Sequence, residues 1–212
     1  MKKNYYWNTF YKSKKFKNTI PSTFSKFCYF KVMKKNVGKS LIDIGCGDAR
    51  DTIFFFKKGF NVLGLDKSSI IIKNNKIKYS GEEKINFLNK DINFFSFKKL
   101  KKFDYIYLRF FFHTISENTE KILMKNIKEI IKKNTIIMLE FRTDKDPLMM
   151  KGKVISFNER FTDHYRRFIN VDDLIARFKN LNFKVLYKIE RKNLAIHKND
   201  NPVLCRLIIK KK

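Results

Sequence analysis

Short hydrophobic runs along the chain alternate with longer stretches in which hydrophobic and polar residues mix. From Lys39 onward, these runs predict seven strands, at residues 41–44, 61–65, 85–88, 103–108, 135–141, 183–189 and 203–209. The intervening stretches predict helices at residues 49–58, 69–78, 118–132 and 171–180. Asn170 is suited to cap the last helix. This alternation is typical of βαβ units, so we expect an α/β fold with a parallel sheet and helices on both faces.

The first 38 residues differ in character from the rest. They are aromatic and basic, with Trp7 and Tyr11 near the start and Phe24 and Phe27 at near-helical spacing. We expect residues 1–38 to form a helical preface that covers one edge of the sheet, and residues 39–212 to form a single domain. The longest stretch without a predicted element, 142–168, is expected to be a functional or disordered loop.

Hydropathy and cysteine usage narrow the class of protein. No uncharged run approaches the length of a membrane-spanning helix, and the N-terminus lacks the apolar core of a signal peptide. We therefore expect a soluble, cytoplasmic protein. Cys28, Cys46 and Cys205 lie far apart without a CxxC pair, so neither a disulfide framework nor a metal site is predicted. The sequence does not indicate the oligomeric state.

The formal net charge of +28 raises nucleic acid as a partner, because clustered Lys and Arg attract phosphate at long range. The excess is nearly all lysine, however, and it is spread along the chain beside many Asn, Ile and Phe residues. A bias in composition would give the same solvated lysine faces. The sequence also lacks Arg-rich stripes with interleaved aromatic residues. Nucleic acid stays open as a partner but is not favoured over a small-molecule or saccharide substrate.

A glycine-rich turn directly follows the first predicted strand, in the run Asp43-Ile44-Gly45-Cys46-Gly47. Glycine allows a tight turn and a close approach to a ligand, and the start of the next helix presents unpaired N–H groups. Asp66 ends the second strand, where a carboxylate can accept hydrogen bonds from both ribose hydroxyls of an adenosine. The two features together predict an adenosine-type cofactor.

Two cofactor chemistries compete for this turn. A dinucleotide site would have a third glycine near the position of Arg50. Asp43 and Asp48 flank the turn, and their carboxylates would repel a pyrophosphate but attract the ammonium group of a methionine tail. The charges favour S-adenosylmethionine over NAD.

These motifs resemble those of the class I S-adenosylmethionine-dependent methyltransferases, most strongly over residues 39–141. Residues 43–47 match the first motif, Asp66 the second, and Asp91 the acidic residue of the third, whereas Ala49 departs from a third glycine that many members carry. The resemblance implies a Rossmann-like, doubly wound, seven-stranded, mostly parallel sheet with the last strand antiparallel. The cofactor-binding residues that we predict are Asp43, Gly45, Cys46, Gly47, Asp66, Lys67, Asp91, Ile92, Arg109 and Tyr11.

The residues after the fourth predicted strand are candidates for the substrate side, because ligands of open α/β sheets bind beyond the carboxyl ends of the strands. Arg109 and His113 stand there in place of the Asn/Asp-Pro-Pro-aromatic signature common in N-methyltransferases. A guanidinium can hold a carboxylate or phosphate, and an imidazole can act as general base toward a hydroxyl. Arg109 can equally form a salt bridge with Glu140 or Asp91, and His113 can pack under the next helix.

A second candidate cluster follows the fifth strand. Arg142 ends that strand, and the long loop after it contains His164, Tyr165 and Arg166. Loops of this kind often carry function, so we expect a lid over the substrate. His164 and Tyr165 are candidates for proton transfer, and Arg142 and Arg166 are candidates for binding an anion. A basic loop is also what this composition produces without any function.

The segments around Arg109 and 162–168, with Asn201-Pro202-Val203, resemble small bacterial methyltransferases grouped with tellurite-resistance and with thiol- or polysaccharide-modifying enzymes. The resulting hypothesis is a methyltransferase that methylates an oxygen of a small anionic or sugar-like acceptor, such as a surface-polysaccharide precursor. The alternatives are an RNA or ribosome methyltransferase that uses the basic surface, and a non-catalytic partner subunit with a methyltransferase fold.

Overall fold

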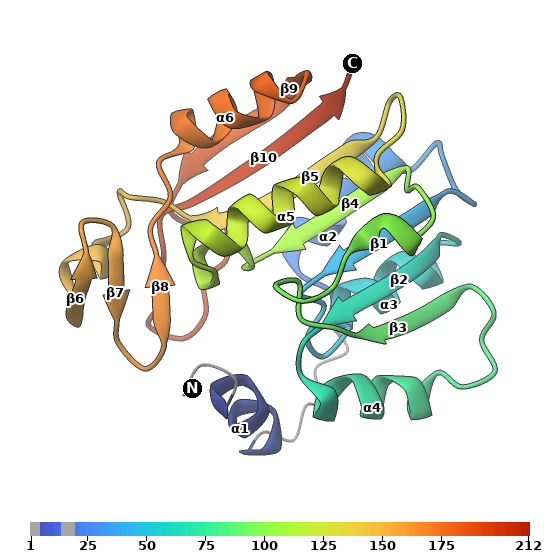
Figure 1. The fold of residues 1–212 in the computed structure, drawn as a ribbon, viewed down its shortest axis with the longest axis horizontal. Helices are drawn as coiled ribbons and strands as arrows, with labels where there is room; N and C mark the ends of the chain where they lie inside the picture. The colour runs from blue at the N-terminus through green and yellow to red at the C-terminus, as the bar shows by residue number, and fades with distance from the viewer. Residues whose placement is uncertain (1–4, 14–19) are drawn as a thin grey trace.

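A seven-stranded sheet in the order β3-β2-β1-β4-β5-β10-β9 forms the core of the computed structural model, which describes residues 5–13 and 20–212 (Figure 1). Neighbouring strands run parallel except at β10, which pairs antiparallel with both β5 and β9. The predicted doubly wound sheet with an antiparallel last strand is confirmed. The strands are β1 (Ser40–Ile44), β2 (Asn61–Asp66), β3 (Ile85–Asn89), β4 (Tyr105–Arg109), β5 (Ile136–Arg142), β9 (Phe183–Arg191) and β10 (Leu204–Lys211).

Helices cover both faces of this sheet because the strands are apolar on both sides. The main helices are α3 (Arg50–Lys57), α4 (Ser69–Lys78), α5 (Glu117–Ile130) and α6 (Val171–Asn180). Leu123 of α5 and Phe178 of α6 share one apolar cluster with the sheet, and Phe55 of α3 belongs to the cluster on the other face. The side chain of Asn170 accepts the N–H groups at the start of α6, as predicted. All four predicted helices are present, with ends that differ by two residues at most.

The described residues of the predicted preface do not cover an edge of the sheet. α2 (Thr23–Cys28) and the π-helix η1 (Tyr29–Met33) pack on one face, where the ring of Phe24 stacks on Tyr107 of central strand β4 at 5.3 Å. The expectation of an edge is wrong because the apolar side of α2 matches the buried side chains of the central strands. Residues 1–4 and 14–19 of the preface lie outside the described residues.

The helix α1 (Tyr5–Ser13) lies apart from α2, at the carboxyl ends of the strands between α4 and β8 (Figure 1). Asn8 of α1 accepts the Ser68 hydroxyl just before α4, at 2.7 Å. Two residues earlier in the same helix, the Tyr6 hydroxyl donates to Asp163, in the turn between β7 and β8, at 3.1 Å. α1 is therefore bonded both to the segment before α4 and to the turn before β8.

Residues 142–168 are not a loop without regular structure. They contain the 3-10 helix η4 (Pro147–Met150) and the strands β6 (Lys153–Ser156), β7 (Glu159–Phe161) and β8 (Tyr165–Arg167), which form a separate antiparallel sheet. These strands are too short, and β6 too exposed, to show the hydrophobic alternation that predicts a strand. The small sheet holds the turn with Asp163 and His164 beside α1 (Figure 1).

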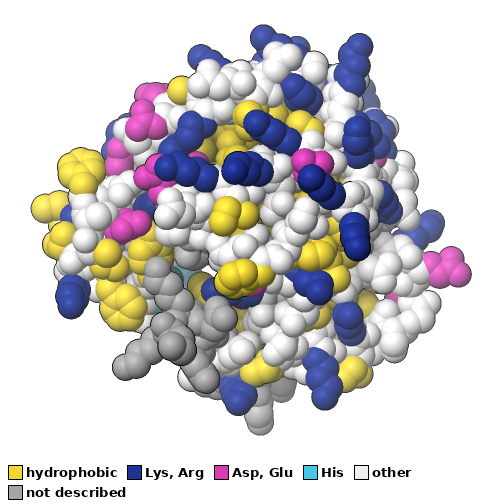
Figure 2. Space-filling model, viewed as in Figure 1, with side chains coloured by type: hydrophobic (Ala, Val, Ile, Leu, Met, Phe, Trp, Pro, Cys, Tyr) yellow, Lys and Arg dark blue, Asp and Glu magenta, His cyan; other side chains and the backbone are white. Residues whose placement is uncertain are grey.

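Lysine and arginine side chains are scattered over the visible face of the molecule, with acidic side chains among them (Figure 2). The basic residues of this face follow many elements and do not form one stripe. None of the described helices has the length and hydropathy needed to cross a membrane.

Candidate active site

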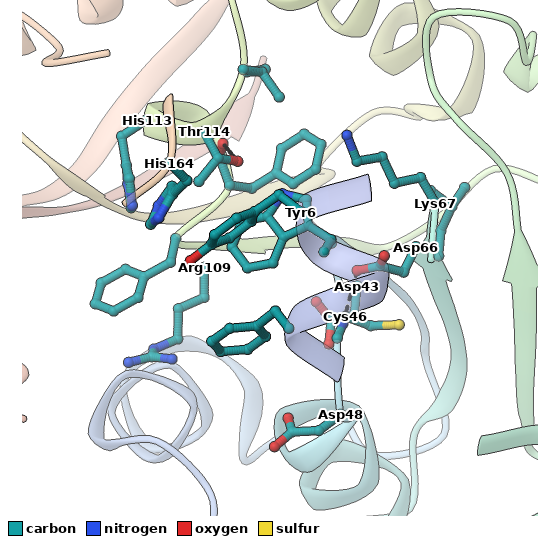
Figure 3. A pocket seen from close by; sticks show the side chains of 18 of the residues that line it. Tyr6, Asp43, Cys46, Asp48, Asp66, Lys67, Arg109, His113, Thr114 and His164 are labelled. Atoms are coloured by element: carbon teal, nitrogen blue, oxygen red, sulfur yellow. Dashed lines mark hydrogen bonds between the residues drawn. The ribbon is translucent and has the colours of Figure 1, made fainter. Parts of the chain in front are cut away.

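A cavity of about 1060 Å³ lies at the carboxyl ends of β1, β2, β3 and β4, against α1. Ligand pockets for drug-sized molecules commonly measure about 300–1,000 Å³, so this cavity has room for a cofactor and an acceptor together. Asp66 and Lys67 lie toward one end, which we call the cofactor end (Figure 3). His113 and His164 lie toward the other, which we call the acceptor end.

Two glycines in left-handed conformation form the turn at the cofactor end. The φ angle is +81° at Gly45 and +50° at Gly47. A Cβ atom on Gly45 would lie 2.4 Å from the Phe111 ring, and one on Gly47 would lie 2.4 Å from the Tyr11 hydroxyl. The Gly45 N–H donates to the Leu65 carbonyl of β2 at 2.7 Å. The turn is therefore fixed against β2, its backbone angles favour glycine, and a larger residue would displace Phe111 or Tyr11.

Asp66 ends β2 directly beside this turn. Its Oδ2 accepts the Gly47 N–H at 3.1 Å, and its Oδ1 accepts the Ser68 N–H at 2.9 Å. Each carboxylate oxygen can accept a second hydrogen bond, so both can still receive a ribose hydroxyl. Burial raises the pKa of Asp66. Lys67 follows it with an exposed side chain that lines the cavity.

Asp43 is a buried carboxyl group in acidic surroundings. It accepts the Thr52 hydroxyl at 2.6 Å. Burial raises the pKa of Asp43 to about 8, and the charges of Asp51, Asp66 and Asp48 add to the rise. A bound cation would stabilise the ionised form of Asp43. The ammonium group and the positive sulfur of S-adenosylmethionine are such cations, so these residues fit the predicted cofactor.

The other predicted cofactor residues lie in the same cavity. Asp91 and Ile92 follow β3 and line its wall. Tyr11 reaches it from α1, and burial raises the pKa of its hydroxyl. Cys46 is buried, and its Sγ lies 3.0 Å from the position that a Cβ atom on Gly64 would take.

Arg109 ends β4 at the acceptor end. Its Nε donates to Oε1 of Glu140 at 2.8 Å, and Oε2 of the same fully buried carboxylate accepts from Nε of Arg206 at 2.6 Å. The guanidinium of Arg109 also lies over the Phe110 ring, 4.1 Å from its centre. The salt bridge to Glu140, which the sequence left open, is thus present. Arg109 still lines the cavity, at its acceptor end.

His113 lies in the 3-10 helix η3 (Phe112–Thr114) and lines the cavity although it is buried. Its Nδ1 accepts the backbone N–H of Arg142 at 3.3 Å. Burial, together with the charges of Arg142 and Arg166, holds the pKa of His113 well below its usual value. The ring is therefore neutral with its proton on Nε2, and in this tautomer Nε2 donates a hydrogen bond.

The turn before β8 brings His164 and Arg166 to the cavity. Nδ1 of His164 lies 3.0 Å from Oδ2 of Asp163, and the Arg166 guanidinium donates to Oδ1 of the same carboxylate at 2.6 Å. Burial and the charge of Arg166 lower the pKa of His164, although Asp163 opposes the shift. A neutral His164 that donates its Nδ1 proton to Asp163 keeps an acceptor lone pair on Nε2.

The structure does not bring Tyr165 to the cavity. Successive side chains of a strand point to opposite faces, so Tyr165 faces away from His164 and Arg166. Its hydroxyl donates to Glu159, and Tyr165 is not among the residues that line the cavity. Tyr165 therefore lies apart from the other residues predicted for the substrate side.

Arg142 lines the cavity but is already ion-paired. Its guanidinium contacts Asp146 at 3.0 Å and also Asp200.

Among residues 5–13 and 20–212, no group of three His, Cys, Asp or Glu side chains could hold a metal ion.

Several cavity residues were missed by the sequence analysis. The rings of Tyr6 and Trp7 in α1 lie 4.8 and 5.5 Å from the His164 ring. Asp163, which binds four neighbouring side chains, and Phe110, with an unusual φ of +54°, were not singled out either. The aromatic cluster at the start of the chain is visible in the sequence, but nothing local to it indicates that it meets the turn before β8.

Comparison with known proteins extends these observations. The family model described as "Methyltransferase domain" matches residues 22–188. No curated protein matches the chain in sequence. Among solved structures, a SAM-dependent methyltransferase from Methanosarcina mazei aligns with a TM-score of 0.71 at 14% identity, over 85% of this chain and 97% of the other. TehB from Haemophilus influenzae aligns with a TM-score of 0.69 at 20% identity, over 97% of this chain and 67% of the other.

The glycopeptide N-methyltransferase MtfA, solved with S-adenosylhomocysteine, aligns with a TM-score of 0.65 at 12% identity, over 93% of this chain and 94% of the other. Identities this low show a common fold and no more. The family match spans most of the chain, and the residues that match the family's motifs line one cavity together. The chain belongs to the class I S-adenosylmethionine-dependent methyltransferases, and S-adenosylmethionine is its cofactor.

Proposed function

We propose that the protein transfers the methyl group of S-adenosylmethionine to an oxygen of a small-molecule acceptor. The observation that supports this most is the single cavity that joins the acidic glycine turn to a pair of neutral histidines. MtfA is named as a methyltransferase of a glycopeptide, which favours a small acceptor for this chain as well. The cytoplasm, where this cofactor is made and used, is the compartment that we propose.

The residues of the cofactor end have distinct proposed roles. Asp66 receives the ribose hydroxyls, Asp91 the adenine amine, and Asp43 the ammonium of the methionine tail, with Gly45 leaving room for that tail. Ile92 packs near the adenine ring. When bound, S-adenosylmethionine supplies a methyl group already activated by the positive charge on sulfur. The protein therefore contributes chiefly by holding the reactants in line and excluding water, and α1 lies where it can do the latter.

At the acceptor end, the geometry gives His113 and His164 different tasks. His113 donates through Nε2, so it orients the acceptor oxygen, whereas His164 accepts through Nε2 and takes the proton. His164 is thus the general base of this proposal, oriented by Asp163. The arginines support an anionic acceptor less than the sequence suggested, because Arg109, Arg142 and Arg166 each already contact a carboxylate.

The substitution Asp66→Ala tests the cofactor assignment. It removes two charge-assisted hydrogen bonds to the ribose, so we expect the dissociation constant for S-adenosylmethionine to rise by about a hundredfold in titration calorimetry. Asp172→Ala removes the same charge from an exposed position and should leave the affinity unchanged. Thermal unfolding of both variants controls for the fold. Unchanged affinity in folded Asp66→Ala protein would refute the assignment.

The acceptor class is tested by incubating the protein and labelled S-adenosylmethionine with a cell extract that is then fractionated. We expect label in the small-molecule fraction, and none with Asp66→Ala. Label in RNA instead would contradict the proposal and would point to the dispersed lysine surface as the docking site (Figure 2).

A further inference from the structure

The two histidines of the acceptor end form a matched hydrogen-bonding pair. His113 presents a donor at Nε2 because its Nδ1 accepts the Arg142 N–H, and His164 presents an acceptor at Nε2 because its Nδ1 proton goes to Asp163. Both rings line the acceptor end of the cavity (Figure 3). A hydroxyl group suits such a pair, since its oxygen can accept one hydrogen bond while its hydrogen is donated to the other ring.

Aromatic rings surround this pair on two sides. From α1, Tyr6 and Trp7 pack against His164 with ring centroids 4.8 and 5.5 Å apart. From the end of β4, Phe110 packs edge-on against His113 at 5.4 Å, and Phe111 lines the cavity beside the glycine turn. Phe110 is held at a φ of +54°, a strained angle for this residue that is typical of functional sites. The walls therefore favour a flat, apolar ring over a hydrated sugar.

The charges of the acceptor end are already balanced. Arg109 is paired with Glu140, Arg166 with Asp163, and Arg142 with Asp146 and Asp200. An anionic acceptor would have to compete with these carboxylates for each guanidinium. An uncharged acceptor leaves all of the ion pairs in place.

We propose that the acceptor is an uncharged aromatic or heteroaromatic molecule whose hydroxyl is attached directly to the ring. The ring lies between the aromatic side chains of α1 and those after β4, and the hydroxyl bridges His113 and His164. This inference rests on the proposed function, because it names the acceptor class of the same site.

The acceptor hydroxyl, S-adenosylmethionine and His164 account for every bond, electron pair and proton in the transfer. A lone pair of the hydroxyl oxygen forms the new bond to the methyl carbon. The bond between that carbon and sulfur breaks, and its electron pair returns to sulfur and cancels the positive charge. The hydroxyl proton moves to Nε2 of His164 and is then released to water. The products are the aryl methyl ether and S-adenosylhomocysteine.

The basicity of His164 suits an acidic hydroxyl of this kind. Burial and Arg166 lower the pKa of His164, with Asp163 opposing them and His113 remaining neutral beside it. A weak base of this kind is better matched to a ring hydroxyl, which is acidic, than to an alcohol of a sugar.

Binding can be measured apart from the reaction. Protein saturated with S-adenosylhomocysteine is titrated calorimetrically with 2-naphthol and with its saturated counterpart, decahydro-2-naphthol. We expect 2-naphthol to bind at least about tenfold more tightly, because only the flat ring stacks between the two walls. Trp7→Leu should remove most of that preference. Phe94→Ala alters an exposed ring that does not line the cavity and should keep it.

A separate test concerns the proton. His164→Gln should lower the rate of methyl transfer to 2-naphthol by about a hundredfold or more while its binding changes little. Equal affinity for the two alcohols, or no detectable binding of either to the loaded protein, would overturn the acceptor class and leave the proposed function intact. Failure to bind S-adenosylhomocysteine at all would instead reject the proposed function.

Discussion

The two ends of the cavity are assembled in different ways. Most of the cofactor end comes from three consecutive strand tips between residues 43 and 92, to which α1 adds Tyr11. The acceptor end is assembled from α1, the segment after β4, the turn before β8 and the loop at residues 195–200. Cofactor recognition is therefore a local property of the chain, whereas acceptor recognition exists only when distant segments have packed together.

The ends also differ in how their charges are satisfied. At the cofactor end, Asp43 and Asp66 accept hydrogen bonds from a hydroxyl group and from backbone N–H groups, and burial raises the pKa of both. At the acceptor end, Arg109 and Arg166 are ion-paired within the protein. One end thus gains from a bound cation, and the other does not require a bound charge.

Among the substitutions that test this difference between the two ends, Glu140→Gln is expected to have the largest effect. The change leaves Arg109 and Arg206 without the buried carboxylate that both contact, so we expect a loss of about 4 kcal/mol in the free energy of unfolding in urea titrations. Glu117→Gln, in an exposed pair with Lys121, should change it by less than about 0.5 kcal/mol. A similar small change for Glu140→Gln would mean that the ion pairs do not hold the acceptor end.

The second largest effect is expected from pH, because titration of Asp43 should make the cofactor affinity depend on it. Its pKa is about 8 in the free protein because of burial and of Asp51, Asp66 and Asp48. A cationic ligand favours the ionised form and lowers this pKa, so protons compete with the ligand below pH 8. We expect the affinity for S-adenosylmethionine to rise by about tenfold per pH unit from roughly pH 6 to 7.5.

The matched variant for that measurement is Asp43→Asn, which cannot ionise. It should bind weakly with a flat profile over the same pH range. Asp172→Asn, at an exposed position, should reproduce the slope of the unmodified protein. A slope that persists in Asp43→Asn would assign the titration to another group.

The smallest effect is expected from Tyr6→Phe, which deletes the hydrogen bond between α1 and Asp163. One such bond stabilises a contact by about 1 kcal/mol, so α1 should leave the turn before β8 more often. Trp7 is the one tryptophan of the chain, and its quenching by acrylamide should increase about threefold. Affinity for S-adenosylhomocysteine should stay within about twofold, and a larger loss would show that the two ends are not separable.

The same contrast explains what the sequence could predict. Asp43, Gly47 and Asp66 could be assigned because the chemistry of a glycine turn and a strand tip is contained within a few residues. The small sheet β6–β8 could not be predicted, because β6 is exposed along its length and shows no alternation of hydrophobic and polar residues. Without a strand at 165–167 there was no basis for deciding which side chains share a face, and this is why Tyr165 was grouped with His164.

Arg206 contacts residues that are synthesised long before it. Its guanidinium contacts Glu140, which precedes it by 66 residues, and the Thr23 hydroxyl, which precedes it by 183. At about 5–20 residues per second, a ribosome needs several seconds to advance from Glu140 to Arg206. During that interval the carboxylate on β5 lacks one of its two cations, and β10 has not yet filled the gap between β5 and β9. The central sheet can therefore close only after synthesis of β10, and a chain truncated before this strand would leave β5 and β9 without their shared neighbour.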